Sequence, residues 1–237
     1  MKQKQNIAKA LAKNESIFAD INQVINDIVN KLAAQKRIIA VIAPPILLAS
    51  MYPVFQLLSG LIGNDRVAWY LGLAVYWLVW GLIFPIIMLG IQNVRELIKP
   101  QRITKKLLML LAIPLIGAIA ARLVPGMAGY EKEGILIFFL ILSTPFGNGF
   151  FEELLWRGVY FKLFPKNVFY RMIWPSLWFG LWHYIPVSIN NSELTGLIGM
   201  IVGPIMMGLY LAFLTKKTNT LWWAIVAHTI GGFIMVS

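Results

Sequence analysis

Residues 134–164 read GILIFFLILSTPFGNGFFEELLWRGVYFKLF, and this stretch indicates the class of fold. As one straight helix it would measure about 46 Å at about 1.5 Å per residue, whereas the hydrocarbon core of a bilayer is about 30 Å thick. The segment 143–149, STPFGNG, places a proline and two glycines near its middle. Because such residues bend or interrupt helices, we expect two membrane helices that meet there at a kink.

The composition of the whole chain is typical of a protein that crosses the membrane several times. Of the 237 residues, 59% are hydrophobic and 13% are charged, and the mean hydropathy is +0.72. Soluble domains carry about 45–50% apolar and about 25% charged residues, so this class is excluded, and intrinsic disorder is excluded by the same comparison. Cysteine is absent, which excludes a disulfide framework, a thiolate metal site and a cysteine nucleophile.

The apolar runs predict an all-α, polytopic membrane protein of about seven transmembrane helices. We expect these spans at residues 38–61, 67–91, 107–124, 134–164, 172–186, 196–214 and 221–236. The chain then divides into a cytoplasmic N-terminal arm at 1–37, N-terminal transmembrane helices at 38–133 and a group of core helices at 134–237.

The N-terminal arm is the one long polar stretch, and it carries an amphipathic pattern. Apolar residues recur in it at three- and four-residue spacing: Ile17, Ile21, Val24, Ile25, Ile28 and Leu32. The arm lacks the compact apolar segment and small-residue cleavage site of a secretory signal peptide. Two interpretations stay open, a helix lying on the inner leaflet and a helix that binds a partner, and the first is favoured.

The charges between the spans predict the orientation. With the N-terminus in the cytoplasm, the outer side holds Arg66 and Lys132, with Arg122 near the outer end of its helix. The basic arm and most other basic residues then lie inside: Arg95, Lys99, Arg102, Lys105, Lys106, Arg157, Lys162, Lys166, Arg171, Lys216 and Lys217. The net charge of +11 is therefore explained by the positive-inside rule rather than by nucleic-acid binding. We expect a multi-pass protein of a bacterial inner membrane.

Among the ionisable residues inside the predicted spans, four stand out, namely Glu152, Glu153, His183 and His228, and the two histidines are the only ones in the chain. Ionisable side chains are costly in a membrane and indicate function. Counted from the cytoplasmic boundary at 1.5 Å per residue, the histidines lie roughly 13–17 Å deep and Glu152 roughly 15–21 Å deep. Three groups from three helices at similar depth predict a single site.

Helical spacing divides the roles of the two glutamates. Glu153 and Arg157 are four residues apart in the order that favours an ion pair, so we assign both to the structure of the site. Neighbouring residues on a helix point about 100° apart, so Glu152 faces the other spans and is assigned to chemistry. A carboxylate with two imidazoles can activate water, bind a divalent metal such as zinc, or do both. The alternative is that the histidines only hydrogen-bond between helices and the glutamates are solvated interfacial residues.

Three motifs in this half of the chain resemble one known family. Residues 152–158, EELLWRG, resemble the EExxxR motif of the CPBP family, which comprises CAAX prenyl endopeptidases and Abi-type, bacteriocin-processing intramembrane proteases. Residues 179–183, FGLWH, are similar to the family's FxxxH motif, and residues 208–228 resemble its last core helices. The likeness covers about residues 134–237 and marks them as a CPBP-like catalytic core.

The resemblance implies roles for individual residues. Glu152 and His183 would activate a water, His228 would stabilise the oxyanion, and Phe179 would structure the site. The last family motif, HxxxN, supplies a second oxyanion donor, but its place here is taken by Gly232, which has no side-chain donor. Whether a metal takes part stays open: Glu152, His183 and His228 could hold a divalent ion, or the site could need no cofactor.

These observations predict an intramembrane endopeptidase that uses a glutamate- and histidine-activated water. Its expected substrates are membrane-inserted or lipid-modified peptides, such as leader peptides and bacteriocin or pheromone precursors, and its other partners are membrane lipids. The alternative, which Gly232 favours, is a non-catalytic membrane scaffold or bacteriocin-immunity protein that regulates a membrane partner. A proton-relay transporter is less well supported, because the spans contain no matched interrupted segments in two halves.

Overall fold

The computed structural model describes residues 2–122, 135–189 and 194–236, and every regular element in these ranges is a helix. The chain forms two compact units, Met1–Ile39 and Ala40–Ser237. The all-helical class is therefore confirmed for the described residues. The number of seven spans and the amphipathic character of the arm stay predictions.

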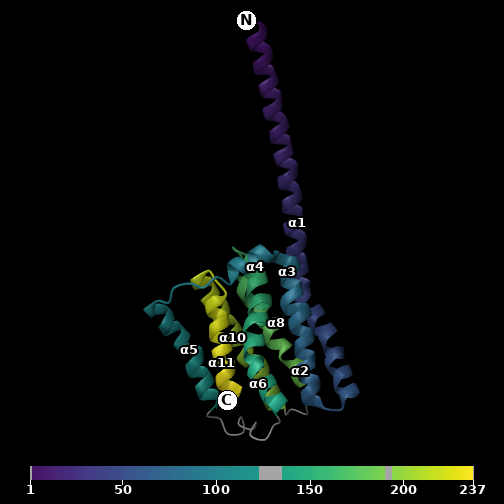
Figure 1. The fold of residues 1–237 in the computed structure, drawn as a ribbon, viewed down its shortest axis with the longest axis vertical. Coiled ribbons are helices and arrows are strands. Elements are labelled where there is room, and N and C mark those ends of the chain that lie inside the picture. Colours follow the sequence, from purple (N-terminus) through teal and green to yellow (C-terminus); the bar gives the residue numbers. More distant parts are fainter. Residues whose placement is uncertain (1, 123–134, 190–193, 237) are drawn as a thin grey trace. The chain divides into compact units, whose positions relative to one another are not determined.

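Helix α1 (Lys2–Ile62) contains the arm and the first predicted span (Figure 1). The second predicted span is built from α2 (Asp65–Tyr76), the π-helical segment η1 (Trp77–Ile83) and α3 (Phe84–Leu89). Asn64 starts α2 as its N-cap, because its side-chain oxygen accepts a hydrogen bond from the Val67 N–H. Gly90 ends α3 with a φ of 79°, a conformation that favours glycine, and α4 (Ile91–Leu97) follows.

Three helical stretches among the described residues are long and apolar enough to cross a membrane: Asp20–Ile62, Asp65–Leu89 and Ile198–Thr218. A fourth apolar helix, Trp222–Ile234, is shorter. These helices support a membrane protein, in agreement with the composition. The predicted span boundaries at residues 124 and 134, and the outer-loop residue Lys132, lie outside the described residues.

The stretch that opens the second half of the chain stays helical from residue 135 to 163. It comprises α6 (Ile135–Gly147), the π-helical segments η2 (Asn148–Glu152) and η3 (Leu154–Val159), and α7 (Tyr160–Leu163). Within the segment 143–149, where two helices were predicted to meet at a kink, α-helix gives way to π-helix at Asn148 and the backbone stays helical. The kink itself stays a prediction. Local widening absorbs irregular residues without the loss of helical hydrogen bonding.

The remaining elements complete the unit Ala40–Ser237. They are α5 (Lys105–Arg122), η4 (Phe169–Ile173), α8 (Trp174–Trp182), α9 (Tyr184–Val187), α10 (Leu194–Thr218) and α11 (Trp222–Val236). Helix α8 packs on α10, and α11 packs on α5, α6, η2 and α10 (Figure 1). The buried core contains aromatic side chains from distant parts of the sequence, including Phe55, Tyr76, Trp156, Phe179 and Trp182.

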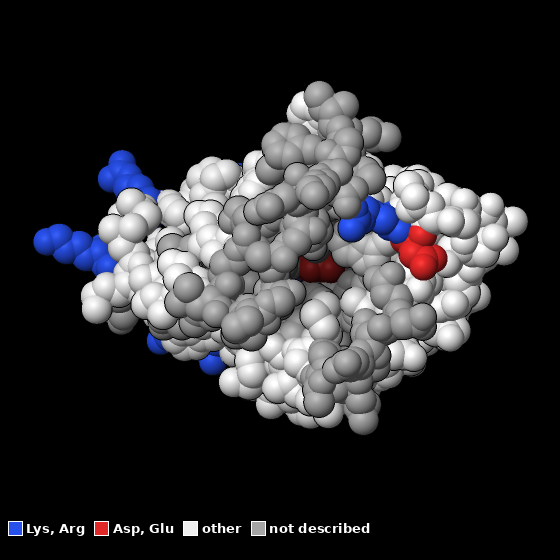
Figure 2. Space-filling view, turned by 90° about the horizontal axis from the view of Figure 1, so that it is seen from below, with Lys and Arg blue, Asp and Glu red and all other residues white. Residues whose placement is uncertain are grey.

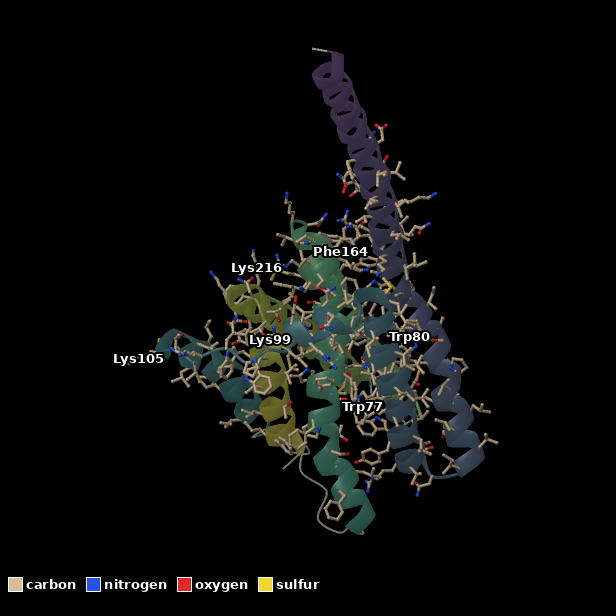
Figure 3. All side chains as sticks on the ribbon, turned by 45° about the horizontal axis from the view of Figure 1, so that its top comes forward. Trp77, Trp80, Lys99, Lys105, Phe164 and Lys216 are labelled. Atoms are coloured by element: carbon tan, nitrogen blue, oxygen red, sulfur yellow. The ribbon has the colours of Figure 1, made fainter. Side chains whose placement is uncertain are left out.

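One end of the unit Ala40–Ser237 gathers basic residues from segments that are far apart in the sequence. Lys99, Lys105 and Lys216 lie at this end in Figure 3. The turn before α11 is fixed there, because the Thr220 hydroxyl is 2.8 Å from the Leu97 carbonyl oxygen and 2.9 Å from the Lys99 carbonyl oxygen. This gathering matches the charge distribution from which the orientation was predicted.

Candidate active site

The two candidate glutamates lie where the helix is wider than an α-helix. Glu152 ends η2, Glu153 follows it, and η3 begins at Leu154. In a π-helix the hydrogen bonds run from residue i to i+5, and short π-helical segments occur frequently at functional sites. The wider turn changes the angle between neighbouring side chains. The α-helical separation of about 100°, on which the division of roles was based, therefore does not hold at this position.

Helix α11 comes close to α6 and η2 because glycines form the contact. A side chain at Gly149 would collide with Thr229, and a Cβ at Gly232 would lie 3.1 Å from Pro145 Cβ. Small residues let two helix backbones approach in this way. The approach brings His228, the residue before Thr229, against the two glutamates. Gly232 is thus a packing position, and Pro145 occupies the space beside it.

His228 lies between the two carboxylates. Its Nδ1 is 2.8 Å from Glu153 Oε1, and its Nε2 is 3.6 Å from Glu152 Oε2. Since a carboxylate only accepts, the Nδ1–H of His228 donates to Glu153, which orients the ring and turns Nε2 toward Glu152. The second separation is within ion-pair range but too long for a direct hydrogen bond.

Glu152 is a buried carboxylate with one oxygen left unpaired. The residue is 1% exposed. Its Oε1 accepts a hydrogen bond of 3.1 Å from the Trp182 indole N–H, whereas Oε2 is buried without a hydrogen-bond partner in the described part of the chain. Buried polar atoms are nearly always hydrogen-bonded, and exceptions are found at catalytic sites. Among the described residues, Glu153 Oε2 and Arg157 Nη2 are buried without a hydrogen-bond partner as well. Glu152 Oε2 differs from them in lying 3.6 Å from His228 Nε2, so it is the atom from which we expect water to be activated.

Glu153 also forms the ion pair with Arg157 that the four-residue spacing predicted. Arg157 Nη1 is 2.7 Å from Glu153 Oε1, and the two side chains are 2% and 0% exposed. The Arg157 guanidinium also lies 4.3 Å from the centroid of the Phe179 ring, in cation–π contact. Two carboxylates and one guanidinium lie together in this buried cluster.

His183 is half-buried and is held by its own helix. Its Nδ1 is 2.7 Å from the Phe179 carbonyl oxygen, so the Nδ1–H donates and Nε2 keeps the lone pair. The Phe179 ring meets both imidazoles edge to face, with centroids 4.7 Å from His183 and 6.0 Å from His228. No hydrogen bond or ion pair among the described residues joins His183 to Glu152 or Glu153.

The residues predicted as possible metal ligands do not converge on one point. Among the residues that the structure describes, no three His, Asp or Glu side chains could hold a single ion. A catalytic zinc site needs three protein ligands at about 2.0–2.2 Å. Glu152, His183 and His228 therefore do not fit a shared metal ion in this arrangement, and no chemical step is assigned to one.

Two aromatic residues belong to the site although no predicted role pointed to them. Trp182 and Tyr76 stack with ring centroids 3.9 Å apart, and the Tyr76 hydroxyl accepts a hydrogen bond of 2.9 Å from Trp156 Nε1. This stacking fixes the indole that donates to Glu152. Trp182 could have been noticed as the residue directly before His183, whereas Tyr76 comes from a distant helix and has no such signal.

In the face drawn in Figure 2, acidic atoms lie well below the surrounding surface. Two acidic residues in the described part of the chain are buried, Glu152 and Glu153, with exposed fractions of 1% and 0%.

The comparison with known proteins agrees with the motifs. No curated protein and no solved structure matches the chain. One family model matches, described as type II CAAX prenyl endopeptidase Rce1-like, over residues 134–234. This family, which belongs to the CPBP proteins, consists of intramembrane peptidases. The matched range includes Glu152, His183 and His228. The resemblance to the CPBP family is thereby confirmed for residues 134–234.

Proposed function

We propose that this chain is an intramembrane endopeptidase in which Glu152 activates the attacking water. The observation that carries the proposal is the environment of the Glu152 carboxylate. One oxygen is fixed by Trp182 at 3.1 Å, and the other is unpaired and 3.6 Å from His228 Nε2. The match of residues 134–234 to a peptidase family supports the same assignment.

In this mechanism Glu152 acts first as a base and then as an acid. Its Oε2 takes a proton from water while the water oxygen bonds to the carbonyl carbon of the scissile peptide. The carbonyl electrons move to oxygen and form a tetrahedral oxyanion. Glu152 then gives the proton to the leaving nitrogen as the C–N bond breaks, which restores the carboxylate.

His228 stabilises the oxyanion. The Glu153 carboxylate bound to Nδ1–H, at 2.8 Å, stabilises an imidazolium, whose Nε2–H can then donate to the developing charge. Glu153, Arg157 and Phe179 act as positioning residues for this ring. Gly232 has no side chain that could serve as the second hydrogen-bond donor to the oxyanion. In this mechanism a backbone N–H or a water takes that place.

His183 orients the water. Because its Nδ1–H is held by the Phe179 carbonyl oxygen at 2.7 Å, its Nε2 is the acceptor that can bind a water hydrogen. This role needs a water between His183 and Glu152, since the two side chains are not in direct contact in the structure.

The proposed substrates are membrane-inserted or lipid-modified peptides, such as leader peptides and bacteriocin or pheromone precursors. The apolar helices support a site that is reached from lipid. We place the protein in a bacterial inner membrane with seven spans and a cytoplasmic N-terminus. The lysines gathered at one end in Figure 3 support this orientation, because basic residues favour the cytoplasmic side.

A second candidate is a non-catalytic membrane scaffold or bacteriocin-immunity protein. Two observations favour it: His183 does not contact the glutamates, and Gly232 supplies no oxyanion donor and packs against Pro145. A scaffold of this kind would tolerate replacement of His183 and His228 as long as the fold survives.

The experiment that separates the two candidates compares membrane peptides from cells that express different variants. Wild type, Glu152→Gln and the control Glu96→Gln, an exposed glutamate on α4, are first brought to equal membrane levels. We expect peptide fragments, measured by mass spectrometry, that are lost in Glu152→Gln and kept in Glu96→Gln. Identical peptide profiles in all three, together with an unchanged phenotype, would support the scaffold instead.

A further inference from the structure

The N-terminal arm repeats its apolar residues with the spacing of a coiled coil. Steps of four and three alternate through Ile7, Leu11, Asn14, Phe18, Ile21, Ile25, Ile28 and Leu32, with Asn14 as the single polar member. These positions form the a and d series of a heptad, with Leu11, Phe18, Ile25 and Leu32 at a. The segment is helical throughout. An average apolar period of 3.5 residues over nearly four heptads is typical of helices that wind around each other.

Within the unit Met1–Ile39, the apolar stripe is exposed wherever its side chains are described. Phe18, Ile21, Ile25, Ile28 and Leu32 are between 49% and 67% exposed. Val24 and Val29 lie beside the stripe and are exposed to a similar degree. A contiguous exposed apolar surface of this kind marks an interaction site.

The polar side of the arm argues for a protein partner rather than a lipid surface. Between Phe18 and Asn30 every polar residue is an amide or an acid: Asp20, Asn22, Gln23, Asn26, Asp27 and Asn30. Helices that lie on a membrane carry Lys and Arg on the polar face, because the inner leaflet is negatively charged. This central stretch, with two aspartates and no basic residue, is unfavourable at such a surface, and the lysines of the segment, Lys9, Lys13 and Lys31, lie outside it.

We propose that residues 7–32 join further copies of this chain in a parallel coiled coil. Asn14 points to an identical partner, since a polar residue at one core position is best accommodated opposite its own counterpart, and it then fixes the register. Copies in the same membrane enter their first apolar helix from the same side, which presents the arms in parallel. Isoleucine at the d positions Ile21 and Ile28, together with leucine or isoleucine at three of the four a positions, favours more than two strands.

Site-directed crosslinking tests the seam directly, because the natural chain has no cysteine. Single cysteines are placed in the full-length protein at the core positions, Ile21→Cys and Ile28→Cys. Matched controls are placed on the outer face of the same helix, Gln23→Cys and Asn30→Cys. After mild oxidation in native membranes, we expect several-fold more disulfide-linked product of twice the chain mass at the two core positions than at the two controls.

A second pair of variants tests whether the seam holds the copies together. Ile21→Asp combined with Ile28→Asp should convert the purified protein in detergent from an oligomer to a monomer, as measured by light scattering. Gln23→Asp combined with Asn30→Asp should leave the oligomer intact. Tryptophan fluorescence of both variants checks that the unit Ala40–Ser237 is still folded.

Several results would overturn the proposal. Equal crosslinking at all four positions indicates random collision, and no crosslinking at any position indicates a monomer. A crosslinked product that contains another protein indicates a different partner. Core cysteines that do not crosslink, but become shielded from a water-soluble maleimide by phosphatidylglycerol-containing vesicles, indicate a helix on the membrane surface.

Discussion

The Glu153–Arg157 ion pair makes a quantitative prediction about stability. The variant Arg157→Met removes the guanidinium and leaves the Glu153 carboxylate, which is 0% exposed, without its nearest positive charge. Breaking a buried ion pair by removal of one partner costs about 3–5 kcal/mol. Because the Nδ1–H of His228 still donates to the same oxygen at 2.8 Å, we expect the lower end of this range, about 3 kcal/mol.

The change is measured as a shift in thermal unfolding. For a protein of this size, 1 kcal/mol corresponds to about 2–4 °C, so Arg157→Met should unfold about 6–12 °C below wild type. The nine tryptophans provide the fluorescence signal in detergent. Arg95→Met, which replaces an exposed arginine on α4, is the matched control and should unfold close to wild type.

A double variant tests the physical reason for the shift. The double variant Glu153→Gln with Arg157→Met lacks both charges, so no unpaired carboxylate is left buried. It should therefore unfold at a higher temperature than Arg157→Met alone. For a coupling energy of about 1–2 kcal/mol between the two side chains, the difference is roughly 2–8 °C. Two results would contradict this explanation. One is an unfolding temperature of Arg157→Met equal to that of the control Arg95→Met. The other is a decrease in the double variant equal to the sum of the decreases in Glu153→Gln and Arg157→Met.

Three further predictions test individual contacts. Trp182→Phe keeps the ring but removes the donor to Glu152, so the rate constant for cleavage at saturating substrate should fall by about 5–150-fold, equivalent to about 1–3 kcal/mol, with little change in KM. Gly180→Ala places a Cβ 2.6 Å from the Ile201 carbonyl oxygen. An overpacking cost of about 1–3 kcal/mol should lower its unfolding temperature by about 2–12 °C. The control Gly199→Ala, where nothing lies within 4 Å of the added Cβ, should unfold at the wild-type temperature. Thr220→Val removes the hydroxyl bound to the carbonyl oxygens of Leu97 and Lys99 and should cost about 1 kcal/mol, measured by the same thermal unfolding.

Helix spacing and helix length, read from the sequence, predicted two parts of the site. The Glu153–Arg157 pair followed from a spacing of four residues, and it is present. The convergence of Glu152 and His228 followed from counting residues to a similar depth, and the two side chains are 3.6 Å apart. Both results depend on helical rise and periodicity, which the sequence specifies directly.

Other parts depend on tertiary contacts that no local pattern reveals. The π-helical segments bring Glu152 and Glu153 to the same imidazole, which an α-helical period does not predict. His183 has a similar predicted depth, but its hydrogen bond to the Phe179 carbonyl oxygen holds it away from the glutamates. The donor to Glu152, Trp182, is positioned by stacking on Tyr76, a residue more than one hundred positions earlier in the chain.

The central claim is that Glu152 performs the chemistry. The most direct test is the initial rate of cleavage of an identified peptide substrate by purified protein in lipid, compared between wild type and Glu152→Gln at equal folded concentration. Loss of a general base lowers the rate by about 10²–10⁴-fold, so we expect a decrease in this range with the unfolding temperature maintained. A Glu152→Gln protein that cleaves at the wild-type rate would contradict the claim.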